Sequence, residues 1–153
     1  MILSGQQIEE RKIVNPFMPR TRLPNGLTYG CGPASYDVRV EFDEDGERDQ
    51  LLLPPGEFAL VSTMEQFYMP LDVAATVHDK STWARLGLAV QNTFIDPGWT
   101  GYLTLELTNH SETELILERG EPIAQLVFHQ VGMVTHGYSG KYQAQERGPV
   151  KPR

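Results

Sequence analysis

The sequence predicts an all-β fold of the sandwich, jelly-roll or small-barrel type. Short segments with strand character follow one another between residues 35 and 131, and turn-forming sequences separate them. The segments are SYDVRVEF, LLLPPGEFALVSTMEQF, DVAATVH, GLAVQNTFI, GYLTLELTN, ELILERG and IAQLVFHQV. The turns are DEDG, PPG, DPGWTG, NHSE and ERGEP. This spacing of short strands and tight turns is typical of antiparallel sheets.

Alternation of apolar and polar residues is clearest in the segment 102–108. Successive side chains of a strand point to opposite faces, so Leu103, Leu105 and Leu107 share one face. We therefore expect Glu106 to point away from the leucine face.

The two ends of the chain depart from the strand pattern. Ser4 and Gln7 have the spacing of a capping box, which predicts a helix of one or two turns. Residues 15–33 are rich in Pro, Gly and Asn and predict an ordered arm with turns. Residues 132–153, called the tail below, have three glycines before Lys141 and no periodic apolar pattern. Alone, the tail should be mobile.

Length and composition exclude several classes of protein. A chain of 153 residues can bury one core and is too short for two comfortable domains. The net charge of −7 and pI near 5.0 argue against general binding to nucleic acid or to an anionic membrane, although a local basic cluster could hold a small phosphate. The acidic stretch EFDEDGERD is most simply a solvated hairpin turn.

The metal-ligating residue types and the termini give further limits. The single cysteine, Cys31, allows neither an intrachain disulfide framework nor a cysteine-based zinc site. We see no targeting segment and no membrane span, so the cytoplasm is the expected compartment. Four histidines lack the spacing of metal ligands and are interpreted as structural or exposed: His78, His110, His129 and His136.

A candidate anion site lies at residues 80–85. Ser81 or Thr82 would be the N-cap of a short helix, and Lys80 precedes them. Free amides at a helix start, two hydroxyls and a lysine can bind an anion. The alternative is an ordinary N-cap with surface charges, in which Arg85 forms a surface ion pair.

Two carboxylates form a second candidate cluster. Asp96 begins a tight turn set by Pro97 and Gly98, and the apolar approach of residues 93–95 would hold it at the mouth of a pocket. Glu106 follows ten residues later, so we expect the two carboxylates on neighbouring antiparallel strands, where they could divide acid and base roles. The alternative is a plain hairpin loop with a solvated glutamate.

Several longer runs resemble one protein family. KSTWARLGL, IDPGWTGYLTLELTN, GEPIAQLVF and GKYQAQ, with GPASYDVRV near residue 35, closely resemble the dCTP deaminases of the dUTPase-like superfamily. The resemblance extends from about Gly32 to Gln145 in order. It implies a distorted β-barrel or jelly roll with short helices, a homotrimer with nucleotide sites between subunits, and Mg²⁺ on the triphosphate. It also implies one nucleotide-binding domain over 1–153, with an N-terminal arm at about 1–33 and a C-terminal lid at about 132–153.

The resemblance assigns roles to the residues of the first cluster and to the acid. Lys80, Ser81 and Thr82 match the phosphate-binding motif, with Ser81 also near the base. Arg85 matches a catalytic-site arginine, and Glu106 matches the catalytic glutamate.

Further residues match contacts to the sugar and the phosphates. Asp96 falls where the family holds the deoxyribose 3′-hydroxyl, and Trp99 where an aromatic ring packs by the sugar. Lys141 and Gln145 match tail residues that fold over the phosphates, and Tyr138 would be a further phosphate contact.

Chemistry agrees with the assignment of Glu106. Deamination of cytosine needs attack of water at C4, a proton at N3 and departure of ammonia, and one carboxyl can move these protons. The zinc deaminases use a metal-bound hydroxide, and their sequence motif includes two cysteines that bind the zinc. This chain has one cysteine and cannot supply those ligands, so the mechanism must be metal-free at the base. Ser81 and Arg85 would order Glu106 and the water and offset charge at the tetrahedral centre.

One departure from the family affects the water site. The segment 89–95 is shorter than in many members, whose backbone there helps to position the attacking water. The function we predict is deamination of dCTP to dUTP and ammonia. The alternatives are a dUTPase or a bifunctional enzyme releasing dUMP and pyrophosphate, in which Asp96 orients the water, and a silent nucleotide-binding regulator.

Overall fold

The predicted all-β fold is confirmed in a computed structural model, which describes residues 1–132 and 134–153. Met133, which belongs to the predicted tail, lies outside the described residues. The helices are α1 (Gly5–Glu10) and α2 (Ser81–Ala84). The strands are β1 (Val14–Asn15), β2 (Thr21–Arg22), β3 (Thr28–Cys31), β4 (Tyr36–Glu41), β5 (Gln50–Leu53), β6 (Phe58–Tyr68), β7 (Val73–Asp79), β8 (Leu88–Val90), β9 (Phe94–Ile95), β10 (Thr100–Asn109), β11 (Leu115–Glu118) and β12 (Pro122–Gln130). Neither helix is long and apolar enough to cross a membrane.

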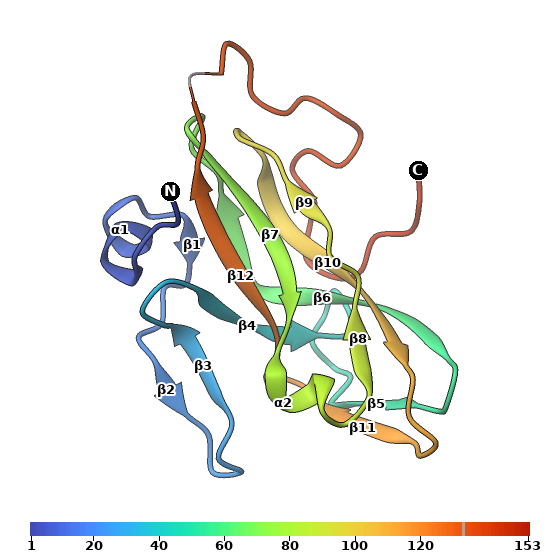
Figure 1. The fold of residues 1–153 in the computed structure, drawn as a ribbon. Coiled ribbons are helices and arrows are strands. Elements are labelled where there is room, and N and C mark those ends of the chain that lie inside the picture. Colours follow the sequence, from blue (N-terminus) through green and yellow to red (C-terminus); the bar gives the residue numbers. More distant parts are fainter. Residues whose placement is uncertain (133) are drawn as a thin grey trace.

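Ten strands form one curled antiparallel sheet (Figure 1). Its main order is β8-β10-β6-β4-β12-β7-β9, with β1 to β3 attached along the side, while β11 and β5 form a separate pair. The segment GLAVQNTFI, predicted as one strand, is two: β8 pairs with β10 and β9 pairs with β7. The chain crosses between them from one end of this strand order to the other, so one continuous strand could not serve both partners.

Strand β10 has the predicted two faces. Leu105 and Leu107 are completely buried and Leu103 is nearly so, whereas Glu106 is half-buried. Thr104, on the face opposite the leucines, is also buried. Its hydroxyl hydrogen-bonds to the tail. The tail therefore covers this part of the outer face of β10 and shields it from solvent.

The capped helix predicted at the N-terminus is also confirmed. Ser4 Oγ accepts from the amide of Gln7, and Gln7 Oε1 accepts from the amide of Ser4, which completes the capping box of α1. The arm at 15–33 is ordered by three short strands and by turns. Gly30 is needed there because its φ is +87°, and an added Cβ would lie 2.5 Å from the carbonyl oxygen of Pro19.

The prediction that EFDEDGERD is a solvated hairpin turn is wrong in two respects. Strands β4 and β5 pair with other strands and not with each other, and the first residue of the stretch is not solvated. Glu41 ends β4 and is completely buried, because Arg119 and Arg147 both donate hydrogen bonds to its carboxylate. Asp43 behaves as expected for a turn, accepting from the amides of Glu47 and Arg48.

The tail packs on its own chain, through contacts that composition does not reveal. Backbone hydrogen bonds join Tyr138 to Pro97 (2.8 Å) and Ala144 to Thr100 (2.9 Å). Gly101 lets the tail approach β10, since an added Cβ would lie 2.6 Å from the backbone nitrogen of Gln145. The tail therefore lies against the Asp96 turn and β10.

Candidate active site

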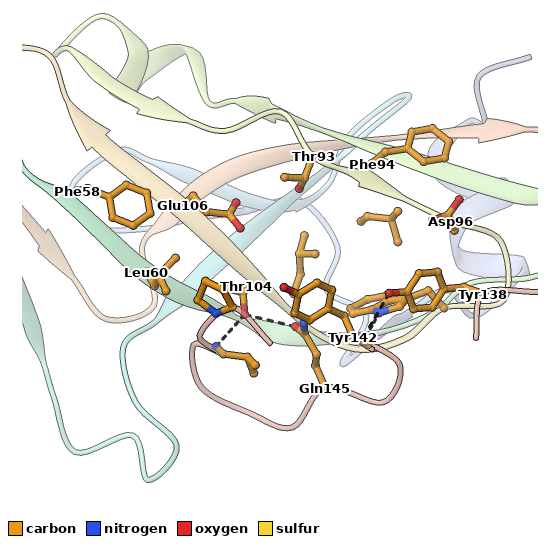
Figure 2. Close-up of a pocket in the computed structure, with 15 residues that line it drawn as sticks. Phe58, Leu60, Thr93, Phe94, Asp96, Thr104, Glu106, Tyr138, Tyr142 and Gln145 are labelled. Carbon is orange, nitrogen blue, oxygen red and sulfur yellow. Dashed lines mark hydrogen bonds between the residues drawn. The ribbon is translucent and has the colours of Figure 1, made fainter. Parts of the chain in front are cut away.

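Glu106 lines a cavity of about 430 Å³ between β10, the Asp96 turn and the tail (Figure 2). The apolar side chains around it come from three strands and the turn: Phe58, Leu60, Phe94, Ile95, Trp99 and Leu103. The polar ones are Thr93, Asp96 and Thr104, together with Glu106 itself. The tail contributes Tyr138, Tyr142, Gln145, Val150 and Pro152.

The environment of Glu106 suits proton transfer. Burial raises the pKa of its carboxyl above the ordinary glutamate value, and a hydrogen bond from its own backbone offsets part of that rise. Its Oε2 is buried and has no hydrogen-bond partner among the described residues. A buried, unpaired carboxyl oxygen in a cavity is available to a ligand or to water. Such a group can both accept and return a proton.

Asp96 reaches the same cavity by a route that differs from the prediction. It follows β9, which pairs with β7, so Asp96 and Glu106 do not lie on neighbouring paired strands. The curl of the sheet and the turn after Asp96 bring the two carboxylates to one cavity instead. Asp96 is exposed, and its environment therefore differs from that of Glu106.

Trp99 fixes the turn to the core and to the tail. Its ring is buried and lies 6.5 Å, centroid to centroid, from that of Phe67. Its indole N–H donates to the carbonyl of Tyr142 at 2.7 Å, and its backbone carbonyl accepts from Met69. The turn that presents Asp96 is thus held from both sides.

The predicted tail residues divide into two groups. Tyr138 and Gln145 line the cavity, and Gln145 Oε1 accepts from the hydroxyl of Thr104 at 3.3 Å. Lys141 does not line it. Its ammonium lies 5.0 Å from the ring centroid of Tyr142 and donates to the carbonyl of Arg153.

Helix α2 holds the remaining predicted residues. The N-cap is Lys80, without a side-chain capping bond, so the prediction that Ser81 or Thr82 is the N-cap is wrong. Lys80 is buried, because its ammonium forms an ion pair with Asp37 at 2.6 Å. Ser81 and Thr82 instead occupy the first turn of the helix and are exposed.

None of the α2 residues lines the cavity of its own chain. Lys80 is directed to Asp37, and Arg85 is exposed at the end of the helix. Trp83 anchors the helix by donating from its indole to the carbonyl of Pro122 at 2.9 Å. One chain therefore presents two separate surfaces, the Glu106 cavity and the outer face of α2.

Several lining residues were not predicted from the sequence. Leu60 and Phe58 lie on β6 opposite Glu106 and Thr108, but this register depends on pairing between residues nearly fifty positions apart. Thr93 lies in the short segment before β9, which is tied to β10 by a hydrogen bond from Gln91 to the carbonyl of Glu106 (3.0 Å). The sequence signal for Thr93 as a lining residue is its position just before Ile95 and Asp96.

Comparison with known proteins identifies the family. A family model described as dCTP deaminase-like matches residues 2–131. The chain belongs to the dCTP deaminase-like family. A dCTP deaminase of Thermococcus sibiricus is 34% identical over 154 residues, covering 100% of this chain and 98% of that protein. A dCTP deaminase of Pyrococcus abyssi is 31% identical over 148 residues, covering 96% of each.

Solved structures give the fold of this dCTP deaminase-like chain. The dUTPase of Staphylococcus bacteriophage 80alpha superposes with a TM-score of 0.57 and 18% identity, covering 85% of this chain and 94% of that one. The EIAV dUTPase has a TM-score of 0.51 and 21% identity, with 71% and 97% covered. At these identities the likeness shows the fold alone, and the dUTPase-like fold predicted from the sequence is confirmed.

The buried ion pair of Asp37 and Lys80 yields a prediction about the stability of the dCTP deaminase-like fold. Replacing Asp37 by Ala leaves the Lys80 ammonium buried without a counter-charge, so we expect the free energy of unfolding to fall by about 3–5 kcal/mol. Urea denaturation measures the change. The control is Arg11→Ala, which removes the partly exposed Arg11–Asp72 pair and should cost much less. Equal losses in the two variants would contradict a structural role for the buried pair.

Proposed function

We propose that this protein deaminates dCTP, converting dCTP and water to dUTP and ammonia. The observation on which the proposal rests is Glu106, a half-buried carboxyl with a buried, unpaired oxygen and a raised pKa, in a cavity of a dCTP deaminase-like chain. The relatives named dCTP deaminase support the choice of substrate, since they match over nearly the whole chain.

Glu106 would move every proton of the reaction. Its carboxylate accepts a proton from water as the oxygen attacks C4, and gives that proton to N3 as the tetrahedral centre forms. In a second transfer Glu106 takes the proton of the new C4 hydroxyl and gives it to the amino group, which leaves as ammonia when the C4–N bond breaks and the carbonyl forms. A carboxyl with a raised pKa is suited to both directions of transfer.

The other cavity residues would hold the nucleotide. Asp96 would accept from the deoxyribose 3′-hydroxyl while Trp99 packs by the sugar, and Tyr138 and Gln145 would close over the phosphates together with Lys141. Mg²⁺ would bind the triphosphate oxygens and offset their charge. Among residues 1–132 and 134–153, no three His, Cys, Asp or Glu side chains gather as metal ligands, so in this proposal the nucleotide supplies them.

We further propose that the site is completed by a neighbouring copy in a homotrimer. Ser81, Thr82 and Arg85 are exposed and do not line the cavity of their own chain, although their proposed roles require them at the same nucleotide as Glu106. Helix α2 of a second copy would supply them. Lys80 stays a predicted phosphate contact, and it would have to leave Asp37 to act as one.

A dUTPase or bifunctional activity is the second candidate. Asp96 shares the cavity with Glu106 and is exposed, so it could orient a water against the α-phosphorus. A silent nucleotide-binding regulator is the third. Incubation with dCTP and Mg²⁺, followed by chromatography of dCTP, dUTP and dUMP, separates the three: dUTP alone supports the deaminase, dUMP the bifunctional enzyme, and no turnover the regulator.

Substitution of Glu106 tests the mechanism. Glu106→Gln keeps the shape of the side chain but cannot accept the proton of water, so deamination should fall by at least about 10²-fold with little change in KM. Asp96→Asn is the matched control on the same cavity, and it should raise KM and, in a bifunctional enzyme, abolish release of dUMP. Wild-type deamination by Glu106→Gln would show that the mechanism is wrong.

The raised pKa of Glu106 predicts the pH dependence. Only the ionised carboxylate accepts a proton, so kcat/KM should fall on the acid side at a pH above the ordinary glutamate value of 4.5. The folded state disfavours the ionised form, so the stability supplied by the protonated carboxyl is lost as pH rises through that raised pKa. Glu106→Gln should therefore be more stable than the wild type at neutral pH and equally stable in acid. Urea denaturation at both pH values checks the stability prediction. An acid limb of kcat/KM at the ordinary glutamate pKa would contradict the kinetic one.

Mixed oligomers test the shared site. Arg85→Ala and Glu106→Gln chains should each be inactive on their own. Unfolded and refolded together in equal amounts, they should regain activity at about one quarter of the sites if each site takes Arg85 from one copy and Glu106 from another. Each of the two residues is then intact with a probability of about one half. Light scattering should give the mass of a trimer. A monomer mass, or no recovery on mixing, would contradict the proposed assembly.

A further inference from the structure

Glu41 is a buried carboxylate that receives two arginines from distant parts of the chain. It is completely buried at the end of β4. Arg119 donates to it from Nε at 2.8 Å and from Nη2 at 2.9 Å, and Arg147 of the tail donates from Nη2 at 2.5 Å. The amide of Phe42 donates as well, at 3.1 Å. Burial would raise the pKa of Glu41, but the hydrogen bonds from the two arginines outweigh it and hold the pKa below the ordinary value.

The two arginines are held differently. The backbone amide of Arg119 bonds to Asp49, and its guanidinium lies so close to Gly46 that an added Cβ there would be 2.6 Å from Nη2. Arg119 is thus part of the body of the protein. Arg147 belongs to the tail, and its Nε is buried without a hydrogen-bond partner among the described residues. Its link to the body through the side chain is therefore Glu41.

Arg147 lies between two contacts of the tail with β10. On one side the carbonyl of Gln145 accepts from the amide of Tyr102 at 3.0 Å, and on the other the amide of Val150 donates to Thr104 Oγ1 at 3.0 Å. Between them Gly148 has a φ of +96°, and an added Cβ would lie 2.7 Å from Cγ of Glu44. The chain turns at this point and brings Val150 and Pro152 to the cavity that contains Glu106.

We propose that Arg147 and Glu41 are positioning residues, whose ion pair fixes this turn of the tail and so holds Val150 and Pro152 as one wall of the Glu106 cavity. Arg119 keeps Glu41 charged and oriented, so the docking point exists whether or not the tail is bound. Loss of the pair frees the wall and admits water to Glu106. The effect on turnover rests on the proposed function, whereas the effect on the tail does not.

Arg147→Met tests the proposal, since methionine keeps much of the length and removes the charge. The reporters in the ligand-free protein are two backbone amides. The amide of Tyr102 in β10 donates to the tail, and the amide of Val150 in the tail donates to β10. Their hydrogen exchange should become at least about tenfold faster, the loss expected for a hydrogen bond to a charged group. Arg147→Lys, which can still reach one carboxylate oxygen, should restore part of the protection. The control is Arg153→Met, an exposed tail residue whose guanidinium donates to the carbonyl of Lys141 at 3.4 Å.

The pH profile provides the readout that a merely structural role would not change. With the wall released, Glu106 is less buried, so the acid limb of kcat/KM should move to lower pH in Arg147→Met and stay in place in Arg153→Met. The other titratable side chains lining the cavity are Asp96, Tyr138 and Tyr142, and both variants leave them intact. Unchanged amide exchange in Arg147→Met overturns the proposal even if the protein has no deaminase activity. Faster exchange with an unmoved acid limb in an active enzyme overturns the positioning role.

Discussion

The enclosure of one carboxyl group, that of Glu106, is the constraint on which the rest of the site depends. Removing a carboxylate from water costs free energy, and a protein meets that cost only where the structure around the group is fixed. Strand β10 is fixed because its leucine face lies in the core. The opposite face is then enclosed by β6, by the segment before β9 and by the tail. The same strand thus anchors the sheet and isolates the acid.

Buried ion pairs connect this sheet to the parts of the chain around the site. Asp37 binds Lys80 before α2, Glu41 binds two arginines, and Glu65 accepts from the backbone and side chain of Arg39 at 3.0 and 2.8 Å. Each joins residues that are far apart in the sequence. Burial raises the pKa of Glu65 despite its partner, whereas the pKa of Glu41 is lowered because it has two. These interior charges connect the start of α2, the loop before β12 and the tail to the sheet.

Local signals in the sequence predicted part of the local structure. The capping box at Ser4 depends on residues three apart, and the alternation of β10 depends on residues two apart, so both could be predicted. The role of Glu106 came from a resemblance, and its position in a cavity agrees with it. The prediction for Lys80 was different. The residues next to it in the sequence suggested a phosphate contact, whereas its observed partner, Asp37, lies 43 residues away. Glu41 was assigned to a solvated turn for the same reason, because neither arginine is near it in the sequence.

The two tryptophans report on different parts of the molecule. The indole of Trp83 donates to the carbonyl of Pro122 beneath α2, and the indole of Trp99 donates to the carbonyl of Tyr142 in the tail. No other tryptophan occurs in the chain. Movement of the tail changes the surroundings of Trp99 and leaves those of Trp83 intact, so the protein contains its own fluorophore for tail motion and a second one as an internal reference.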